Sequence, residues 1–371
     1  MDSTAIDKIS PSSCIRVVPY SAILADTEEA RNNEACVASR NATRYNTCMH
    51  LLDEIETQVP TTTTFEHRVP PWAPYRYTIW QPLIARSQQM SESHIFKIPS
   101  YLYEDLMKCH AHWIRYNALD EEQITEIAEM WESSKASSGI CKLFEADSIK
   151  RWFFRLDRMS TKDSAFPDPS VQSLHDIIKR ICTSHRGCDS LKHELATSGT
   201  MELILNPWDE TIHAEFEYRC FVPPPAARGV ENATAQDFRL TGIAQYRWFK
   251  PLSLPDGMSV EELANKVTEG AKAVLDDIVT YATKEIDPEV LQMLVTSGFV
   301  FDVFIRDGKR VELIELNPFG ANGMILGRQQ CLATIENCAT GRYITVRAAS
   351  EEQHITGNPT HSTESSAYRG K

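Results

Sequence analysis

Three side chains, Asp302, Glu315 and Asn317, are the strongest candidates for chemistry in this sequence. Asp302 and Glu315 belong to two apolar segments, residues 299–305 and 311–316, which are typical of β-strands and are joined by an Asp-Gly turn, and Asn317 directly follows the second segment. Carboxylates gathered on an apolar surface repel one another and lose hydration, so they require a compensating cation. Mg²⁺ prefers hard oxygen ligands and commonly shares them with nucleotide phosphates. The three side chains therefore predict a magnesium site, and simple hydration at exposed strand ends is the alternative.

The three side chains meet only if the hairpin has a suitable register. Pairing Arg306 with Lys309 across a two-residue turn, followed by the alternation of side chains along a strand, places Asp302, Glu315 and Asn317 on one face. We therefore expect replacement of Asp302 or Asn317 by Ala to abolish magnesium-dependent nucleotide binding with little loss of fold.

The elements that must position these residues are strands and helices in alternation. Further strands are predicted from β-branched and aromatic residues at 152–156, 201–205, 217–222 and 240–246. Helices are predicted from capping residues followed by apolar periodicity, and their expected first caps are Ser100, Asp120, Asp168 (before Pro169) and Ser259.

The order of these features resembles the ATP-grasp arrangement, in which a nucleotide lies between two sheets. A basic residue on a strand, Arg155, precedes an apolar strand with a polar end at 203–208, and Glu217 and Arg219 follow before the acidic hairpin. The predicted fold class is α+β and ATP-grasp-like, with the nucleotide between two mainly antiparallel sheets and with flanking helices.

Five ordered blocks are similar to the cell division cycle protein 123 family. They lie within residues 75–330, and Asn-Pro-Phe-Gly at 317–320 is the most specific of them. The blocks begin at Trp152, Glu217, Leu240, Phe299 and Leu313.

The resemblance implies that the cofactors are ATP and Mg²⁺ and assigns a role to each candidate residue. Arg155 and Arg219 are the implied catalytic residues, and Arg155 contacts phosphates. The implied nucleotide contacts are Arg155, Lys162, Leu203, Ile204, Leu205, Asn206, Trp208, Arg219 and Asp302, and the implied metal ligands are Asp302, Glu315 and Asn317. For two residues a structural role stays open beside the phosphate contact. Arg219 could pair with Glu217 instead, and Lys162 could form a capping pair with Asp163.

The site departs from the family pattern at two positions, because Arg155 stands where Lys is usual and Glu315 where Asp is usual. A planar guanidinium fork replaces a point charge, and Glu adds a methylene. These departures favour a divergent ATP-grasp ligase that joins a carboxylate to an amine through an acyl-phosphate in a specialised biosynthetic pathway. Arg247, Lys250 and Arg328 are candidate clamps for the carboxylate substrate.

Two other functions remain open. The resemblance also implies an ATP-dependent assembly chaperone for translation initiation factor 2, acting on its gamma subunit. A scaffold that has lost its nucleotide is the third reading, because both substitutions affect the phosphate and metal positions.

Composition along the chain predicts five regions. Residues 1–20 and 349–371 are polar and expected to be disordered, and residues 21–70 are expected to form an N-terminal helical extension. Residues 71–149 form the N-terminal part of the ATP-grasp-like domain, and residues 150–348 form its central and C-terminal nucleotide- and metal-binding region.

Overall composition excludes several classes of partner. Lys and Arg total 38 against 51 Asp and Glu, and the resulting net charge of −13 disfavours nucleic acid and anionic membranes. The sequence has no long apolar segment and no start typical of a signal peptide, so a cytoplasmic protein is expected. The ten cysteines contain no C-x-x-C pair and are expected to be buried free thiols.

Overall fold

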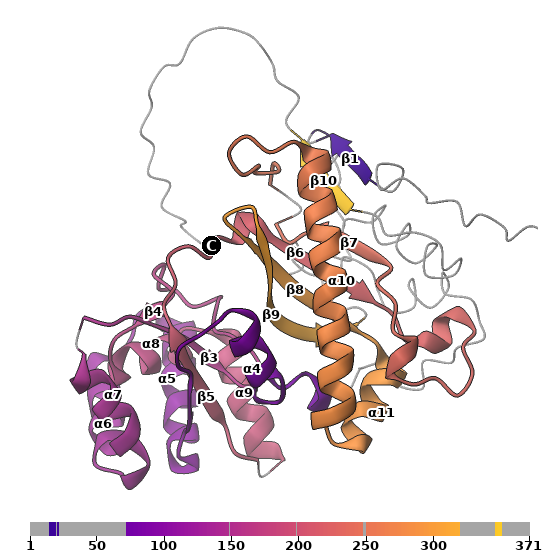
Figure 1. The fold of residues 1–371 in the computed structure, drawn as a ribbon. Helices are drawn as coiled ribbons and strands as arrows, with labels where there is room; N and C mark the ends of the chain where they lie inside the picture. The colour runs from indigo at the N-terminus through magenta and orange to yellow at the C-terminus, as the bar shows by residue number, and fades with distance from the viewer. Residues whose placement is uncertain are drawn as a thin grey trace, which may run out of the picture.

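The computed structural model describes residues 15–19, 21, 72–147, 149–197, 199–247, 250–319 and 346–350. Its strands form two sheets, and helices pack beside each of them (Figure 1). The predicted class, α+β with two mainly antiparallel sheets and flanking helices, is confirmed. The predicted helical extension falls almost wholly outside the described residues, as do Gly320 and Arg328.

The small sheet has the strand order β2-β5-β3-β4 and is antiparallel throughout. Its strands are β2 (His94–Lys97), β3 (Trp152–Leu156), β4 (Ser170–Val171) and β5 (Glu202–Pro207). The helices gathered around it in Figure 1 are α5 (Tyr103–Tyr116), α6 (Glu121–Glu132), α7 (Ser138–Ala146), α8 (Leu174–Cys182) and α9 (His185–Ala196).

Alternation along β3 and β5 decides which side chains face the helices. Phe154 pairs with Leu205, and both belong to the core shared with the helices of this sheet. Arg155 pairs with Ile204, and Ile204 belongs to the core of the large sheet. Because paired residues share a face, Arg155 is directed toward the large sheet.

The large sheet has the order β1-β10-β7-β6-β8-β9. Strands β6 (Glu217–Val222), β7 (Gly242–Gln245), β8 (Phe299–Arg306) and β9 (Arg310–Pro318) pair antiparallel. Strands β1 (Ile15–Pro19) and β10 (Val346–Ser350) extend the sheet in parallel. The long helix α10 (Val260–Glu285) lies across this sheet in Figure 1, with α11 (Pro288–Ser297) after it.

The β8–β9 hairpin differs from its predicted register in two ways. Arg306 pairs with Arg310 instead of Lys309, so the turn has one residue more than predicted. The pairing then passes over Ile314, which forms a β-bulge opposite the step from Asp302 to Val303. The longer turn shifts the pairing by one residue, which alone would move the side chains of β9 to the opposite face. The bulge shifts the pairing by one more residue, so that Glu315 and Asn317 return to the predicted face. Asp302 consequently lies directly opposite Glu315.

Helix α4 (Tyr77–Ser87), which the sequence analysis did not predict, covers the free edge of β9 at this bulge. The backbone N–H of Leu313 donates to Ser87 Oγ at 2.8 Å, and Gln88 Nε2 donates to the Leu313 carbonyl at 2.6 Å. Both polar backbone groups of Leu313 thus find partners outside the sheet, where the bulge leaves the ladder irregular.

Helix starts agree with the predicted caps in part. Asp120 accepts from Gln123 N at the start of α6, and Ser259 and Glu262 form the predicted capping box of α10. The prediction for Asp168 is wrong, because Ser173 caps α8 and Asp168 instead accepts from Arg151 and Ser170. A short strand, β4, occupies the intervening residues.

Two further differences concern the ends and the helices. Residues 15–19, predicted to be disordered, form β1, because their β-branched run pairs with β10. Helices α7, α9 and α11 were also missed, although Ser184 caps α9 and Asp287, followed by Pro288, caps α11. None of the helices within the described ranges is long and apolar enough to cross a membrane.

Candidate functional site

One ion pair joins the two sheets. Arg155 on β3 donates from Nη1 to Glu315 Oε2 on β9 at 2.8 Å. The Arg155 side chain is 6% exposed and that of Glu315 13%, so the pair is largely removed from water. These two residues, which lie 160 positions apart in the sequence, thus mark where the small sheet meets the large one.

A second ion pair lies within the large sheet. Arg219 on β6 and Asp302 on β8 are direct cross-strand neighbours. Arg219 donates to Asp302 through Nε at 2.7 Å and through Nη2 at 2.6 Å, and the two side chains are 5% and 1% exposed. This bidentate geometry is the strongest arrangement available to an arginine and a carboxylate. Asp302, rather than Glu217, is therefore the carboxylate that holds Arg219 in this geometry.

Asn317 connects the two ion pairs. Its Nδ2 lies 3.4 Å from Asp302 Oδ2 and 3.2 Å from Glu315 Oε1. The predicted convergence of Asp302, Glu315 and Asn317 on one face is therefore confirmed, although the register that produces it includes the bulge. We call Arg155, Arg219, Asp302, Glu315 and Asn317 the inter-sheet cluster.

An aromatic ring supports Arg155 from the side of α4. The guanidinium carbon of Arg155 lies 4.0 Å from the centroid of the Tyr77 ring, within the range of a cation–π contact. Asn206 donates to the Tyr77 hydroxyl at 2.9 Å, and Ser93 donates to the amide oxygen of Asn206 at 2.6 Å. Asn206 is thus engaged in holding Tyr77, and Tyr77 in turn orients Arg155.

A further cation reaches the large sheet from the loop after β3. Lys162 contacts the Tyr246 hydroxyl, and its ammonium lies 5.0 Å from the Tyr246 ring centroid. The guanidinium carbon of Arg219 lies 5.1 Å from the centroid of the same ring, and Tyr246 directly follows β7. The neighbouring Asp163 accepts from Ser184 Oγ and from the backbone of Arg186. Of the two roles considered for this pair, Asp163 has the capping role, at the start of α9. Lys162 is instead directed toward the cluster.

Charge and burial act on the carboxyl groups in opposite directions. Burial alone would raise the pKa of Glu315, but the charges of Arg155, Lys162 and Arg219 hold this pKa below its usual range. At Glu217 on β6, burial together with the negative charges of Asp302 and Glu315 outweighs the positive charges of Lys162 and Arg219 and raises the pKa to about 7. Glu315 of the cluster therefore stays ionised, and it lies near a carboxyl group, that of Glu217, whose pKa is close to neutrality.

The residues predicted to line an adenine pocket do not all lie on the same side of the small sheet. Leu203 and Leu205 are fully buried among the helices of the small sheet. Ile204 is buried in the core of the large sheet, and Asn206 is 3% exposed. Trp208, just beyond β5, is half-buried with the Arg151 guanidinium 5.1 Å from its ring. Ile204, in the core of the large sheet, and Asn206, bonded to Tyr77, thus face the inter-sheet side, and a ligand contact by either of them or by Trp208 stays a prediction.

The sequence analysis missed Tyr77 and Tyr246 as members of this region. Tyr77 stands in an aromatic-rich run, Trp72 to Trp80, and Tyr246 ends the predicted strand at 240–246. A tyrosine at a strand end gives no local sign of the guanidinium it will contact, because that partner comes from another element. The aromatic density around Tyr77 was the one available signal.

The donor set of the cluster fits a magnesium ion in ligand type. Asp302, Glu315 and Asn317 offer hard carboxylate and amide oxygens, and one amide nitrogen spans both carboxylates. Rotation of the Asn317 amide would exchange its nitrogen for its oxygen. Within the described ranges no group of three or more His, Cys, Asp or Glu side chains forms a complete metal site. A magnesium ion here would consequently take part of its coordination from water or phosphate.

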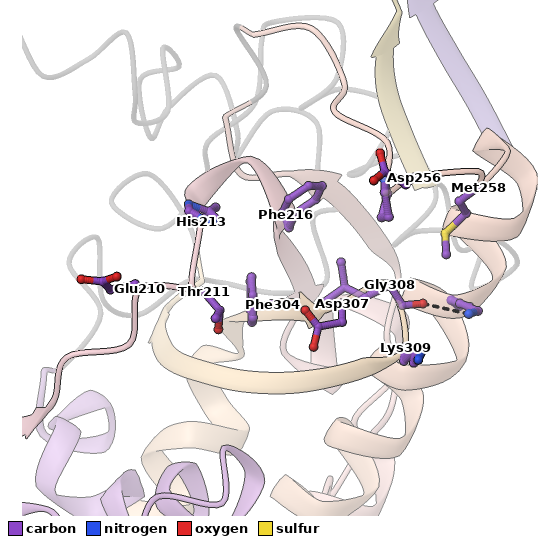
Figure 2. A pocket seen from close by; sticks show the side chains of 13 residues that line it. Glu210, Thr211, His213, Phe216, Asp256, Met258, Phe304, Asp307, Gly308 and Lys309 are labelled. Carbon is purple, nitrogen blue, oxygen red and sulfur yellow. Dashed lines mark hydrogen bonds between the residues drawn. The ribbon is translucent and has the colours of Figure 1, made fainter.

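A cavity of about 580 Å³ lies at the turn of the β8–β9 hairpin, away from the cluster (Figure 2). Its lining mixes apolar side chains, Phe216, Met258 and Phe304, with charged ones such as Asp256 and Lys309. Figure 2 shows these side chains spread around an open space without a convergent polar group. We assign no role in the proposed site to this cavity.

Comparison with known proteins gives matches among solved structures alone. No family model matches the chain, and no curated protein matches it. A structure of Cdc123 from Schizosaccharomyces pombe is similar at 17% identity over 76% of this chain and 99% of that chain, with a TM-score of 0.46. A C-terminally truncated form of Cdc123 from the same organism gives 18% identity, coverage of 75% and 97%, and a TM-score of 0.47. At these identities and TM-scores the likeness assigns neither a family nor a residue role to this chain.

Proposed function

We propose that the inter-sheet cluster binds ATP together with Mg²⁺. The observation that carries the proposal is the convergence of two arginines, two carboxylates and one amide, which come from both sheets and are buried or partly buried. Buried charges are costly to maintain for stability alone, and replacing them by apolar residues is often neutral or favourable. A polyanion with its divalent cation is the ligand for which such a set of groups is suited.

Each group of the cluster has a role in this proposal. Arg155 binds phosphate oxygens as a planar fork, Arg219 adds its positive charge while it stays paired with Asp302, and Lys162 adds a point charge from the loop after β3. Asp302, Glu315 and Asn317 hold the magnesium ion, which neutralises phosphate charge when bound. The adenine lies toward Ile204, Asn206 and Trp208, while Leu203 and Leu205 support β5 from the helix side.

Of the activities implied by the sequence resemblance, we favour the ATP-dependent assembly chaperone for translation initiation factor 2 over the ligase. A ligase requires an electropositive pocket that confines its carboxylate substrate beside the phosphates. The candidate clamps Arg247 and Lys250 are both exposed. A chaperone requires only that bound nucleotide stabilise a docking surface, without rapid turnover.

Calorimetric titration of the full chain with ATP, with and without Mg²⁺, tests the nucleotide proposal directly. Micromolar binding that depends on Mg²⁺ is expected. The matched control is Gln292→Ala on the exposed surface of α11, which should bind like wild type. No heat of binding under either condition would refute the site and leave a scaffold function.

The choice between chaperone and ligase requires separate measurements. Immobilised wild-type chain is expected to retain the gamma subunit of translation initiation factor 2, more strongly with Mg·ATP than without it. Removal of the segment after Phe319 is expected to weaken that retention. Release of ADP that depends on both an added carboxylic acid and an added amine would instead support the ligase.

A further inference from the structure

The two ion pairs of the inter-sheet cluster differ in how firmly they are held. Arg219 and Asp302 are adjacent on one sheet and are joined by two hydrogen bonds. Arg155 and Glu315 come from different sheets and are joined through one guanidinium nitrogen, with Glu315 as the more exposed carboxylate. Exchange of partners is therefore easier at the second pair, since it breaks fewer bonds and leaves both sheets intact.

The Arg155–Glu315 pair competes with both ligands of the proposed site as long as it persists. One N–H of Arg155 Nη1 is used by Glu315 Oε2, and the carboxylate neutralises the guanidinium charge that a phosphate would otherwise meet. Glu315 in turn lies in the field of Arg155, Lys162, Arg219 and Arg186. A divalent cation without a polyanion would have to enter this cationic surrounding, which disfavours its binding.

We propose that ligand binding proceeds by exchange at this pair: the polyphosphate takes Arg155, and Mg²⁺ takes Glu315. This inference rests on the proposed nucleotide function and adds its regulation. Each ligand removes the group that blocks the other, so metal and nucleotide bind with positive coupling that originates in the protein. By linkage, the metal strengthens nucleotide binding by the same factor as the nucleotide strengthens metal binding. In the absence of ligands the pair instead joins the two sheets.

A double-mutant cycle on metal-free ATP binding tests the exchange. The variants are Arg155→Gln, Glu315→Gln and the double variant, titrated with ATP in the presence of EDTA at constant ionic strength. In the wild-type background Arg155 is held by Glu315, so Arg155→Gln is expected to change the affinity less than about threefold. In the Glu315→Gln background Arg155 is released, and its replacement is expected to weaken binding at least about tenfold, which corresponds to about 1.4 kcal/mol.

Equal factors in the two backgrounds would overturn the exchange, because Arg155 would then act independently of Glu315. Glu315→Gln keeps the size of the original side chain, and Arg155→Gln is a shorter polar replacement. Because the double variant carries neither charge of the pair, its fold is expected to persist. Circular dichroism and the unfolding midpoint of each variant verify this. A second pair of measurements uses Mn²⁺ alone, detected by electron paramagnetic resonance. Arg155→Gln is expected to bind Mn²⁺ more tightly than wild type, and binding that is equal or weaker would overturn the exchange.

The outcomes separate the two proposals. Wild type that binds Mg·ATP while the cycle is additive refutes the exchange and retains the nucleotide site. Wild type that binds neither Mg·ATP nor metal-free ATP refutes both. Strong coupling in the cycle, together with the gain in Mn²⁺ affinity, supports both the exchange and the proposed nucleotide site.

Discussion

At the scale of single residues, the two predicted metal ligands Asp302 and Asn317 differ in what they contribute to the fold. Asp302 is 1% exposed and neutralises Arg219, whereas Asn317 makes only two long contacts. The expectation that either alanine substitution leaves the fold intact therefore applies to Asn317 alone. Removing one partner of a buried ion pair leaves a charge in a medium that solvates it poorly.

Asp302→Ala is expected to lower the free energy of unfolding by about 3–5 kcal/mol, because Arg219 loses its carboxylate in the interior. Asn317→Ala should cost about 1 kcal/mol, as expected for ordinary hydrogen bonds. Urea denaturation followed by circular dichroism measures both values. Similar losses for the two variants would show that the Arg219–Asp302 pair is not the stabilising contact we describe.

The carboxyl group of Glu217 predicts a pH dependence of stability. Its pKa in the folded chain is about 7, above its ordinary value of 4.5, so the folded chain binds its proton more tightly than the unfolded chain does. The unfolded state therefore loses this proton first as pH rises, and folding stability falls between about pH 4.5 and 7 by at most about 3 kcal/mol. Above pH 7 this contribution is constant.

Glu217→Gln removes this penalty, since the amide does not ionise. The variant is expected to gain stability relative to wild type as pH rises from 5 to 8, as measured by thermal unfolding at both values. Glu269→Gln, an exposed position on α10, is the matched control and should follow wild type. A difference between Glu217→Gln and wild type that is the same at both pH values would contradict the assigned titration.

At the scale of elements, the candidate site depends on how β9 is held at its edge. The bulge at Ile314 restores the face on which Asp302 and Glu315 meet, and α4 supplies partners for Leu313 beside it. The same helix carries Tyr77 against Arg155. One helix thus stabilises both the register of the hairpin and the orientation of the cation opposite it.

Ser87→Ala is expected to leave the Leu313 N–H without its protein acceptor and to cost about 1 kcal/mol. Hydrogen exchange of the Leu313 amide should become faster, while amides in the centre of β6 stay protected. Ser297→Ala at the end of α11 is a control of the same chemistry away from β9. Unchanged exchange at Leu313 in the Ser87 variant would mean that the bulge is held by other contacts.

A glycine before β8 positions this strand beside the loop that follows β6. Gly298 has φ of 66° and ψ of −178°, a region that is essentially restricted to glycine. A Cβ atom there would lie 2.5 Å from the Pro224 nitrogen and 2.7 Å from the Val222 carbonyl oxygen. Gly298→Ala is therefore expected to cost at least about 2 kcal/mol in urea denaturation. A loss below about 0.5 kcal/mol, typical of surface changes, would show that the backbone relaxes there.

At the scale of the whole molecule, the inter-sheet cluster is where ligand binding and global stability are coupled. A ligand that engages both sheets binds the folded chain and not the unfolded one. Mg·ATP at one hundred times its dissociation constant is expected to stabilise wild type by about 2.7 kcal/mol. The rise in unfolding temperature measures this gain, and Asn317→Ala should reduce it, while Gln292→Ala on α11 should retain it. An equal rise in all three proteins would place the nucleotide outside the cluster.

Local patterns in the sequence were sufficient for much of the fold and for part of the site. The strands at 152–156 and 217–222 and the capping box at Ser259 follow from alternation and capping, which depend on near neighbours. The shared face of Asp302 and Glu315 also follows from alternation, although the predicted turn was wrong. The tertiary structure alone decided which arginine meets which carboxylate. Arg155 and Glu315 are brought together by the packing of two sheets, and no local periodicity carries information across 160 residues.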